Sequence, residues 1–515
     1  MHRNGAESRA AVLAVLVATS CPKTLSMSTP GATLPPEIWI RISSFLDSRE
    51  VTRLYGVNRL FYELALERRY SRLALDRYRA FQRTKACLSA SLARKYVRSV
   101  YIYNVFSHPR SVTAASVAER GGISEQFPSL RRAIWQWIRR YTGRKTSTAP
   151  DPTQLVRDCI LDSLTGAERL QEVAIGGAWS PEYKQYILQP LDAALERHVS
   201  IRRLRVESDK LWVVLPFLHF RGLEDVTVQI SCHTQPELKP SMGALADFLV
   251  HIAPSVRILA LSAADGCPTI DHVSPAVCAD GLTMPELREL SMPITLSTAA
   301  LDALSSKFSA LTKLNLILCA PASAIAPKTA LGNLRLPHLR SLWLAFREHD
   351  DTAGVRDGMW DGSSSGLCRL DDVRIYGRHA VSSEVASICR FFRASPSGIT
   401  RLSLKVVVLD GPLVDMLASS FPHLRDLCIH ARYLLQADTV LGHTMHVHLF
   451  EEQMRDRRYP EWRLSYAIAS LYLPTVSVFV GANQASKEVT TILARSIPSM
   501  EIGDSLKNCS PGQWP

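Results

Sequence analysis

The sequence predicts an α/β protein in which a short N-terminal module of three helices precedes an irregular solenoid. In that solenoid, parallel strands are expected on the concave face and helices on the convex face. Two observations predict this arrangement. Residues 34–65 carry apolar side chains at helical spacing, and an apolar-x-x-apolar-x-apolar hexamer recurs ten times between residues 170 and 429. At 515 residues, the chain is long enough for several domains or for one elongated array.

The first 33 residues precede the first organised segment. MHRNGAESR followed by AAVLAVLVATS has the charged start and the apolar stretch of a secretory signal. The alternative is an upstream start that adds a nonfunctional extension, because Met27 lies just before the helical pattern. The 11 cysteines form no CxxC pair and no short framework, which favours a reducing compartment. We therefore expect residues 1–33 to be a disordered or non-native extension.

Residues 34–65 predict three short helices. Two prolines at residues 35 and 36 favour a helix start, because proline fixes φ and has no N–H to satisfy. An apolar stripe follows, made of Ile38, Ile42, Phe45 and Leu46. The second helix is expected after the turn DSRE with Ser48 as its N-cap, and the third after Asn58. A unit of this size buries too little surface to be stable alone, so its apolar faces must be completed elsewhere.

The segments LPPEIWIRISSFL and LYGVNRLFYELA, joined by a polar turn, resemble an F-box motif without a gap. The resemblance implies that residues 34–73 bind a Skp-type adaptor and, through it, a cullin. By position, the implied adaptor-binding residues are Leu34, Pro35, Ile38, Ile42, Leu46, Leu54, Val57 and Phe61. Two departures are expected to weaken this contact without abolishing it. Phe61 stands where many members have tryptophan, and Ser48, Arg49 and Glu50 make the turn more polar than usual. The alternative is an ordinary helical subdomain that packs on the following chain.

Residues 74–160 are expected to form a basic linker region and the first irregular repeats. Residues 1–145 contain 25 lysines and arginines against 9 aspartates and glutamates, whereas the remainder contains 35 against 39. This excess fits either an acidic or nucleic-acid partner or a solvated arginine-rich helical face. Because no nucleic-acid motif accompanies it, we expect no nucleic-acid partner. VRSVYI at residue 97 and LRRAIW at residue 130 are expected to be early repeats.

The ten hexamers lie within residues 161–505, and residues 506–515 are expected to be a tail. They begin at residues 170, 201, 223, 256, 287, 311, 339, 370, 399 and 424. Helical segments such as ALADFLVHIAPSV and EVASICRFFRASP precede the next hexamer. The pattern resembles leucine-rich repeats, in which each unit supplies one parallel strand and a returning helix. Only LTKLNLILC completes the family signature, with Cys319 at its loop-tying position, so the resemblance implies an irregular arc. SCHTQPELKPSMG and DGMWDGSSSG are expected to be insertion loops.

The residue between the last two apolar positions of each strand is expected to point away from the core, because side chains alternate along a strand. These residues are Arg205, Thr227, Ala260, Ser291, Asn315, Trp343, Arg374, Ser403 and Cys428, flanked by Tyr376, Lys405 and His430. We predict that a target protein binds Arg205, Asn315, Trp343, Arg374 and Lys405, with Trp343 as a hot spot. The alternative is that a neighbouring loop covers Trp343.

Motifs for chemistry are absent from the sequence, which contains no phosphate-binding glycine loop, nucleophile elbow or HExxH helix. His443, His446 and His448 are the best metal candidates if GHTMHVHLFEE is a strand, but an exposed strand edge explains them as well. Cys319 and Cys428 are expected to be small core residues rather than nucleophiles. We therefore predict no catalytic residue, no metal and no cofactor.

Together, these features predict a non-catalytic, cytoplasmic or nuclear substrate receptor of a Skp/cullin/F-box ubiquitin ligase. Such a receptor accelerates modification by holding an unidentified target protein near the conjugating enzyme. No window reaches the ~18 apolar residues of a membrane span, so no membrane partner is expected. Two alternatives are a leucine-rich-repeat scaffold or binding protein without a ligase role, and a secreted leucine-rich protein with a cleaved N-terminus and oxidised thiols.

Overall fold

The structure is a computed structural model of the chain, and it falls into two compact units. It describes residues 35–54, 59–75, 94–103, 161, 164, 167–177, 188, 191–193, 201–220, 222–231, 235–263, 277, 282–295, 297–319, 331–346, 359–360, 362, 364–393, 395–435, 443–471 and 479–500. The first unit comprises residues 1–177 and 182–201, and the second comprises residues 178–181 and 202–515. The predicted α/β class is confirmed, because helices alternate with parallel strands that pair in sequence order within each unit.

The first unit joins three helices directly to parallel strands. Its elements are α2 (Pro36–Ser44), α3 (Ser48–Arg53), α4 (Arg59–Tyr70), β1 (Arg72–Leu75), β2 (Ser99–Tyr103) and β3 (Glu172–Gly176). β1 pairs with β2, and β2 pairs with β3. The hexamers at residues 97 and 170 therefore are strands, while LRRAIW lies outside the described residues. β1 was not predicted, although YSRLAL fits the hexamer if Tyr70 counts as apolar.

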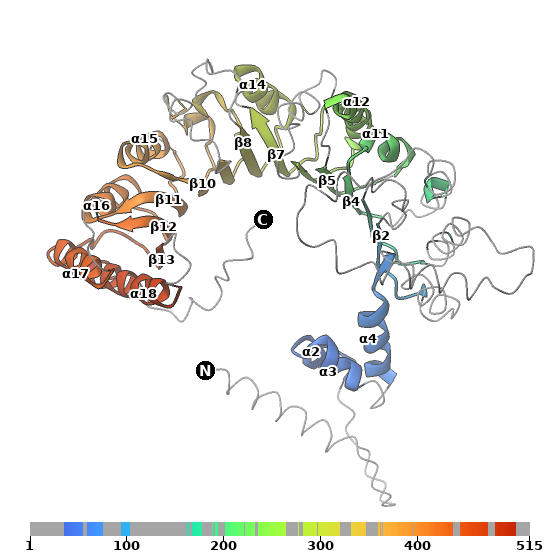
Figure 1. Cartoon of the computed structure of the whole chain (residues 1–515), viewed down its shortest axis with the longest axis horizontal. Coiled ribbons are helices and arrows are strands. Elements are labelled where there is room, and N and C mark those ends of the chain that lie inside the picture. The colour runs from blue at the N-terminus through green and yellow to red at the C-terminus, as the bar shows by residue number, and fades with distance from the viewer. Residues whose placement is uncertain are drawn as a thin grey trace, which may run out of the picture. The chain divides into compact units, whose positions relative to one another are not determined.

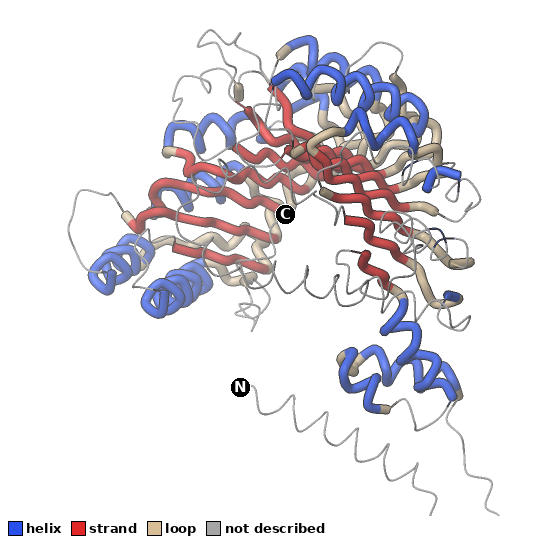
Figure 2. The backbone as a smooth tube through the Cα atoms, turned by 45° about the vertical axis from the view of Figure 1, so that its right-hand side comes forward, coloured by secondary structure: helices blue, strands red, loops and turns tan. Residues whose placement is uncertain are grey.

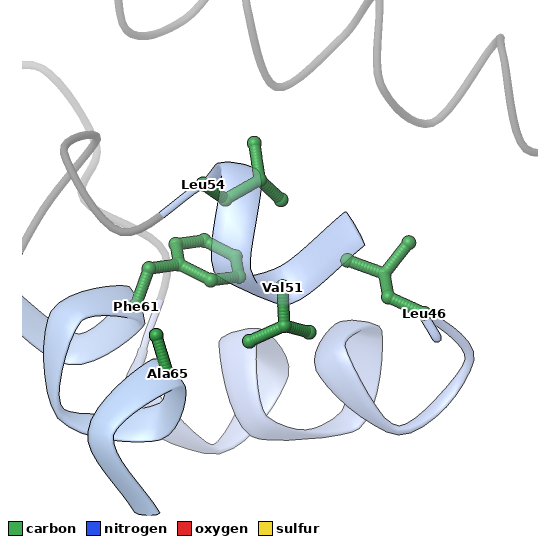
Figure 3. Close-up of a cluster of buried hydrophobic side chains, with 5 residues drawn as sticks. All are labelled: Leu46, Val51, Leu54, Phe61 and Ala65. Carbon is green, nitrogen blue, oxygen red and sulfur yellow. The ribbon is translucent and has the colours of Figure 1, made fainter. Parts of the chain in front are cut away.

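The three helices share a small core of their own, drawn in Figure 3. Its buried members are Leu46, Val51, Leu54, Phe61 and Ala65, and Trp39, Ile42 and Leu64 pack against them. Arg68 of α4 ties the helices together, because its guanidinium donates to the carbonyl oxygens of Leu46 at 2.8 Å and Ser43 at 2.6 Å. Both carbonyls lie at the C-terminal end of α2, where helix carbonyls lack the usual intrahelical donors, and the Ser43 carbonyl also accepts from the N–H of Leu46 at 3.2 Å.

The N-cap of α3 corrects one prediction. Asp47, not Ser48, is the capping residue: its Oδ1 accepts hydrogen bonds from the N–H groups of Arg49 and Glu50, each at 2.8 Å. Glu50 completes a capping box by accepting from the N–H of Asp47 at 2.8 Å. Ser48 is the first helical residue instead. Asn58, the predicted cap of the third helix, lies outside the described residues.

The second unit contributes the remaining strands, which are all parallel and pair with one another in sequence order (Figure 1). They are β4 (Arg203–Ser208), β5 (Asp225–Ile230), β6 (Ile258–Ala263), β7 (Glu289–Thr295), β8 (Lys313–Cys319), β9 (Ser341–Phe346), β10 (Asp372–Ala380), β11 (Arg401–Leu409), β12 (Asp426–Leu434) and β13 (Tyr466–Leu471). Each hexamer from residue 201 onwards forms one of these strands. β13 was missed because its inward positions are Ala467 and Ala469, which are too small to complete the apolar pattern.

Helices cover one face of these strands, and the core lies between the two layers (Figure 2). They are α11 (Leu211–Val214), η3 (Leu215–Phe217), α12 (Gln235–Ile252), α14 (Thr298–Lys307), η4 (Leu331–Asn333), η6 (Ser364–Gly366), α15 (Ser382–Arg393), α16 (Gly411–Ser420), α17 (His443–Met454) and α18 (Phe479–Ser496). Buried strand side chains such as Leu342, Leu344 and Val373 are fully covered. No helix in the described ranges is both long and apolar enough to cross a bilayer.

Two predicted insertion loops contain regular structure. In SCHTQPELKPSMG, helix α12 begins at Gln235 and continues through Pro240, so most of that segment is helical. In DGMWDGSSSG, Trp360 is buried against Phe391 and Phe392, with ring centroids 5.9 Å apart in each pair, and residues from Ser364 form η6. A buried aromatic ring stabilises a short segment that composition alone marks as a turn.

One backbone contact recurs between successive strands. The carbonyl of the residue just before a strand accepts two N–H groups from the next repeat, at 2.8–3.0 Å. Arg202, for example, accepts from Glu224 and Asp225, and Glu224 accepts from Arg257 and Ile258. The other acceptors in this role are Ser71 and Arg98 in the first unit, and Arg257, Arg288, Thr312, Arg340, Asp371, Thr400 and Arg425 in the second. This contact fixes the register between strands whatever the length of the connection.

Candidate protein-binding surface

The predicted outward-facing residues form one row across the second unit, which we call the central row. Each is the register partner of the next, in the order Arg205, Thr227, Ala260, Ser291, Asn315, Trp343, Arg374, Ser403 and Cys428. The residues on either side of each row member along its strand are buried in the core from Leu204 to Ile429. The alternation of side chains that predicted the row is therefore confirmed.

Trp343 lies in the middle of a cluster of aromatic and cationic side chains. The Nζ of Lys313, on β8, is 4.6 Å from the indole ring centroid, and the Cζ of Arg374, on β10, is 4.4 Å from it. The ring of Tyr376 meets it edge-on at 6.4 Å. Such cation–π contacts contribute ~0.5–2 kcal/mol each. Trp343 is half-buried, with Lys313, Arg374 and Tyr376 packed around its ring, and its role as a hot spot stays a prediction.

Carboxylates hold both cations in place. Arg374 forms two hydrogen bonds with Asp372, Nε to Oδ1 at 3.1 Å and Nη2 to Oδ2 at 3.2 Å, and Asp372 is only 5% exposed. Ser341 also donates to Asp372, at 3.0 Å. Burial alone would lower the pKa of the Arg374 guanidinium, but its bonds and attraction to Asp372 raise that pKa above its ordinary value. Lys313 pairs with Glu289 at 3.4 Å.

A bulge in β10 changes the surface next to this cluster. Ile375 pairs with Leu404, but the next pair is Ala380 with Val406, so the register with β11 shifts across residues 376–379, although Tyr376 still pairs with Ala345 on β9. Gly377 makes the bulge possible, because its φ is +95° and a Cβ there would lie 1.7 Å from the carbonyl oxygen of Phe346. The Nζ of Lys405, on β11, donates to the Gly377 carbonyl at 3.3 Å. The bulge thus places a carbonyl and the residue His379 beside the strand face.

A second polar cluster lies on β11, β12 and β13, two residues beyond the central row. Lys405 is the register partner of His430, which in turn partners Ser470. The imidazole of His430 contacts Ser470 Oγ through Nδ1 at 2.5 Å and Cys428 Sγ through Nε2 at 3.3 Å. Burial, with the nearby charges of Lys405 and His379, lowers the pKa of His430 to about 4. Its imidazole is therefore neutral at physiological pH.

The predicted target-binding residues do not all lie together. Asn315, Trp343 and Arg374 are adjacent in the central row, and Asn315 donates to Ser291 at 2.9 Å. Lys405 lies on β11, one strand beyond Arg374 and two residues further along the strand. Arg205 lies on β4, four strands before Asn315 on β8. Sequence reasoning did not name the other polar members of the surface: Lys313, Asp372, His379 and Ser470. Lys313 and Asp372 lie two residues before central-row members on their strands, so the same alternation of side chains could have predicted that they face outwards.

The structure also places most of the residues in the metal and cysteine predictions. His443, His446 and His448 lie in helix α17, not in a strand, so His446 and His448 do not share a face. His448 faces Glu452 at 3.8 Å instead. Within the described ranges, no group of three or more His, Cys, Asp or Glu side chains is placed to hold a metal. Cys428 is half-buried on the strand face rather than in the core, and the side chain of Cys319 lies outside the described residues.

The helical module of the first unit carries a different surface. Of its predicted adaptor-binding residues, Leu46, Leu54 and Phe61 are buried in the module's own core and Ile42 packs against it. Pro35 and Ile38 are exposed, whereas Leu34 and Val57 lie outside the described residues. Phe45 is 72% exposed and Ile38 is 43% exposed. Phe45 is the C-cap residue of α2 and keeps a helical backbone conformation, so it lies seven residues, about two helical turns, from Ile38 and on the same side.

Comparisons with known proteins leave the family open. No protein-family model matches the sequence, and no curated protein matches it. Among solved structures, one match is to a chain in a crystal structure of the Rad7 and Elc1 complex in yeast, with 13% identity and a TM-score of 0.29. The match covers 55% of this chain and 75% of that chain. A likeness this low carries no argument about function, so the fold assignment rests on the strand pairing described above.

Proposed function

We propose that the chain is a non-catalytic substrate receptor of a Skp/cullin/F-box ubiquitin ligase. In this proposal, helices α2–α4 bind a Skp-type adaptor, and the strand face of the second unit binds a target protein. The ligase would gain rate through proximity, because a held target has a high effective concentration at the conjugating enzyme. The observation that carries the proposal is the exposed apolar side of α2.

The apolar side of α2 is unusual because the module has already formed a core without it. Leu46, Val51 and Phe61 are buried inside, yet Phe45 is 72% exposed and Ile38 is 43% exposed. Clustered exposed apolar side chains on a soluble surface indicate a protein contact, since their burial by a partner releases ~25 cal/mol per Å². The F-box resemblance of the same residues names the class of partner.

The direct junction between the module and the sheet favours one alternative. α4 ends at Tyr70 and β1 begins at Arg72, and the Ser71 carbonyl accepts from both Arg98 and Ser99 at 2.9 Å. Arg98 also forms an ion pair with Glu67 of α4. Repeat arrays need a capping element at their ends. The module would then be the cap of a leucine-rich-repeat binding scaffold with no ligase role.

Adaptor binding by surface variants tests the proposal. We expect Phe45→Asp and Ile38→Asp each to weaken binding of a purified Skp-type adaptor about a hundredfold, or ~2.7 kcal/mol. The matched control is Val250→Asp, which places the same charge at a 55%-exposed apolar position on α12. These sites are preferable to Ile42, because Ile42 packs on the core and a charge there would unfold the module.

The two candidate functions predict different outcomes in this experiment. If the wild-type chain binds the adaptor and only the α2 variants lose it, the receptor role is supported. Wild-type protein that does not retain the adaptor at micromolar concentration would leave the capped scaffold as the function. Circular dichroism of each variant serves as the check that an exposed substitution has left the fold intact.

A further inference from the structure

We propose that the edge of the sheet at which β9–β13 begin binds an extended acidic segment of a partner protein. The surface consists of two rows of residues in the turns that enter these strands, which we call the entry rim. The entry rim lies before the strands begin, whereas the central row lies within them. It is a second binding surface, and it does not depend on whether the chain binds an adaptor.

The turns that enter β9–β13 share one pattern of burial. The second residue before each strand is buried in the core, at Leu339, Leu370, Ile399, Leu424 and Leu464. The residues on either side of it are exposed or half-buried. One row of the entry rim contains the residues just before the strands, which are Arg340, Asp371, Thr400, Arg425 and Ser465. The other row contains the third residues before the strands, which are His338, Arg369, Gly398, His423 and Arg463.

Main-chain hydrogen bonds fix the backbone of the entry rim. The first residues of the five strands are successive register partners, in the order Ser341, Asp372, Arg401, Asp426 and Tyr466. The residues just before them therefore follow one another at the strand spacing of ~4.8 Å. The N–H groups of Leu339, Leu370 and Leu424 each donate to the carbonyl three residues earlier, at 3.1–3.2 Å. A partner thus meets a preformed surface.

The entry rim is basic, although the larger part of the chain that contains it is not. Its ten positions hold four arginines and two histidines against one acidic residue, Asp371. Residues 146–515 as a whole contain more aspartates and glutamates than lysines and arginines. The four arginines are exposed and lie outside the described helices, so none of them serves a helix C-terminus, where a cation offsets the helix dipole.

Equivalent positions in the preceding repeats use arginine differently. Arg202 and Arg257 lie just before β4 and β6, and each has a guanidinium Nη1 facing the Glu224 carboxylate between them, at 2.9 Å and 3.8 Å. Those arginines therefore have an acidic partner within the array. Among the residues that the structure describes, none forms an ion pair or a side-chain hydrogen bond with the four arginines of the entry rim. Their guanidinium donors remain available to an anion.

The spacing of the arginines indicates an extended ligand. Arg340 and Arg425 lie three strands apart in one row, which corresponds to ~14 Å at the strand spacing. An extended peptide that runs across the strands covers this distance in about four residues. The guanidinium fork of arginine binds a carboxylate through two parallel hydrogen bonds. We therefore expect the bound segment to carry aspartate or glutamate at positions four residues apart.

The entry rim suits an acidic protein segment better than a nucleic acid. Asp371 lies between the two arginines of its row, where it would repel a phosphate of a continuous backbone, whereas a peptide can place a neutral residue there. Single-stranded nucleic acids also stack their bases on exposed aromatic rings. In the described residues of the five turns no aromatic ring is exposed, because Phe421 and Trp462 are buried and Tyr459 is half-buried.

Peptide binding to the purified full-length chain tests the inference. The probe is a labelled ten-residue peptide with blocked ends, glutamate pairs at positions 2–3 and 6–7, and no other charge. A second peptide has glutamine at these four positions, and a third has four consecutive glutamates. We expect the first to bind at least tenfold more tightly than the second and more tightly than the third. Its affinity should fall as the salt concentration rises from about 0.05 M to 0.3 M, because exposed charges are screened.

Charge reversal localises the contact. The double variant Arg340→Glu with Arg425→Glu should weaken binding of the glutamate-pair peptide at least tenfold. It should also bind the same peptide with lysine in place of glutamate, which the wild-type chain should not retain. The matched control is Arg257→Glu with Arg288→Glu, which reverses two exposed charges at the equivalent positions before β6 and β7. This control should change the affinity less than threefold.

Cross-linking separates the entry rim from the basic first part of the chain. Residues 1–145 carry an excess of lysine and arginine and could attract the same peptide. A photoreactive residue placed between the two glutamate pairs should label the turns that enter β9–β12, as identified by mass spectrometry. The Arg340→Glu, Arg425→Glu variant should lose this labelling.

Four results would overturn the inference. They are no measurable binding of the glutamate-pair peptide, equal binding of the glutamine peptide, a double variant that binds like wild type, and cross-links confined to residues 1–145. A thymidine oligonucleotide of about twenty residues that binds more tightly than the peptide, and is lost in the same double variant, would make the entry rim a nucleic-acid site instead. Adaptor binding by the double variant should be unchanged, so the adaptor experiment and this one succeed or fail separately.

Discussion

The helical module and the strand face of the second unit expose opposite kinds of side chain. On α2 and at its C-cap, Ile38 and Phe45 are exposed apolar groups beside the module's buried core. On the strand face, Trp343 is flanked by Lys313 and Arg374, and both cations are held by carboxylates. Apolar contacts supply affinity with little discrimination, whereas ordered charges reject wrong partners. Under the proposed function, the difference suits a constant partner at the module and a selected partner at the strands.

The two regions also differ in how much core supports them. The module depends on Leu46, Val51, Leu54, Phe61 and Ala65 for its buried interior. The strand face of the second unit lies over a continuous layer of buried side chains, and each strand there pairs in register with the next. A single lost side chain is thus a larger fraction of the interior in the module.

Phe61→Ala should separate the two regions most clearly. Phe61 is completely buried, and removing a buried phenylalanine costs ~3–5 kcal/mol. We expect the amides of α2–α4 to lose protection from hydrogen exchange and adaptor binding to disappear, while target binding by the second unit continues. Unchanged protection in α2–α4 would show that the module draws its stability from elsewhere, and the contrast in core size would be wrong.

Gly377→Ala should damage the strand face and leave the module alone. The new Cβ would lie 1.7 Å from the Phe346 carbonyl oxygen, and φ is +95°. We expect a loss of ~2–4 kcal/mol, measured as faster exchange of the β9–β11 amides. Gly222→Ala is the matched control, because φ is +78° there but the nearest heavy atom is the Arg202 side chain at 3.7 Å. Equal effects of the two variants would mean that the bulge yields without cost.

The double variant Trp343→Ala with Arg374→Ala should weaken target binding by ~2 kcal/mol or more, because such anchors commonly carry that much energy. Adaptor binding should not change. The measurement compares partner recovery in affinity purification with recovery of the adaptor from the same sample. Retention of every partner would place the target contact away from Trp343, and loss of the adaptor as well would indicate general unfolding.

Asp47→Ala should have the smallest effect. It removes the side chain that caps α3 through Arg49 and Glu50, and such substitutions cost ~1 kcal/mol. We expect slightly weaker protection of α3 and adaptor binding reduced less than tenfold. Ser48→Ala is the control and should be close to neutral, because Ser48 is not the cap. A larger loss for Ser48→Ala would contradict the capping box.

The strand array was predictable because its signal is repeated and local. Each hexamer from residue 170 onwards is a strand, and the alternation of side chains placed the central row correctly from Arg205 to Cys428. The prediction failed where a signal was weak or ambiguous. Ala467 and Ala469 hid β13, and histidines at period two suggested a strand where α17 is a helix.

The details of the candidate surface were less predictable, because they depend on contacts between distant residues. Nothing near His379 in the sequence indicates that it acts on His430, since the bulge and two strand pairings intervene. Gly377 inside a strand pattern was the available sign of a bulge. Similarly, the motif that pointed to the adaptor did not reveal that Leu46, Leu54 and Phe61 are buried in the module's own core.

The carbonyl that accepts two N–H groups has a consequence for how this array can change over evolutionary time. The contact uses only main-chain atoms, and it joins residues as different as Thr312, Arg340 and Asp371 to the following repeat. A duplication or deletion with ends at two such positions would preserve every donor and acceptor, whatever the residues between them. Whole repeats can thus be gained or lost in one genetic event, which would change the strand face while the helical module is inherited unaltered.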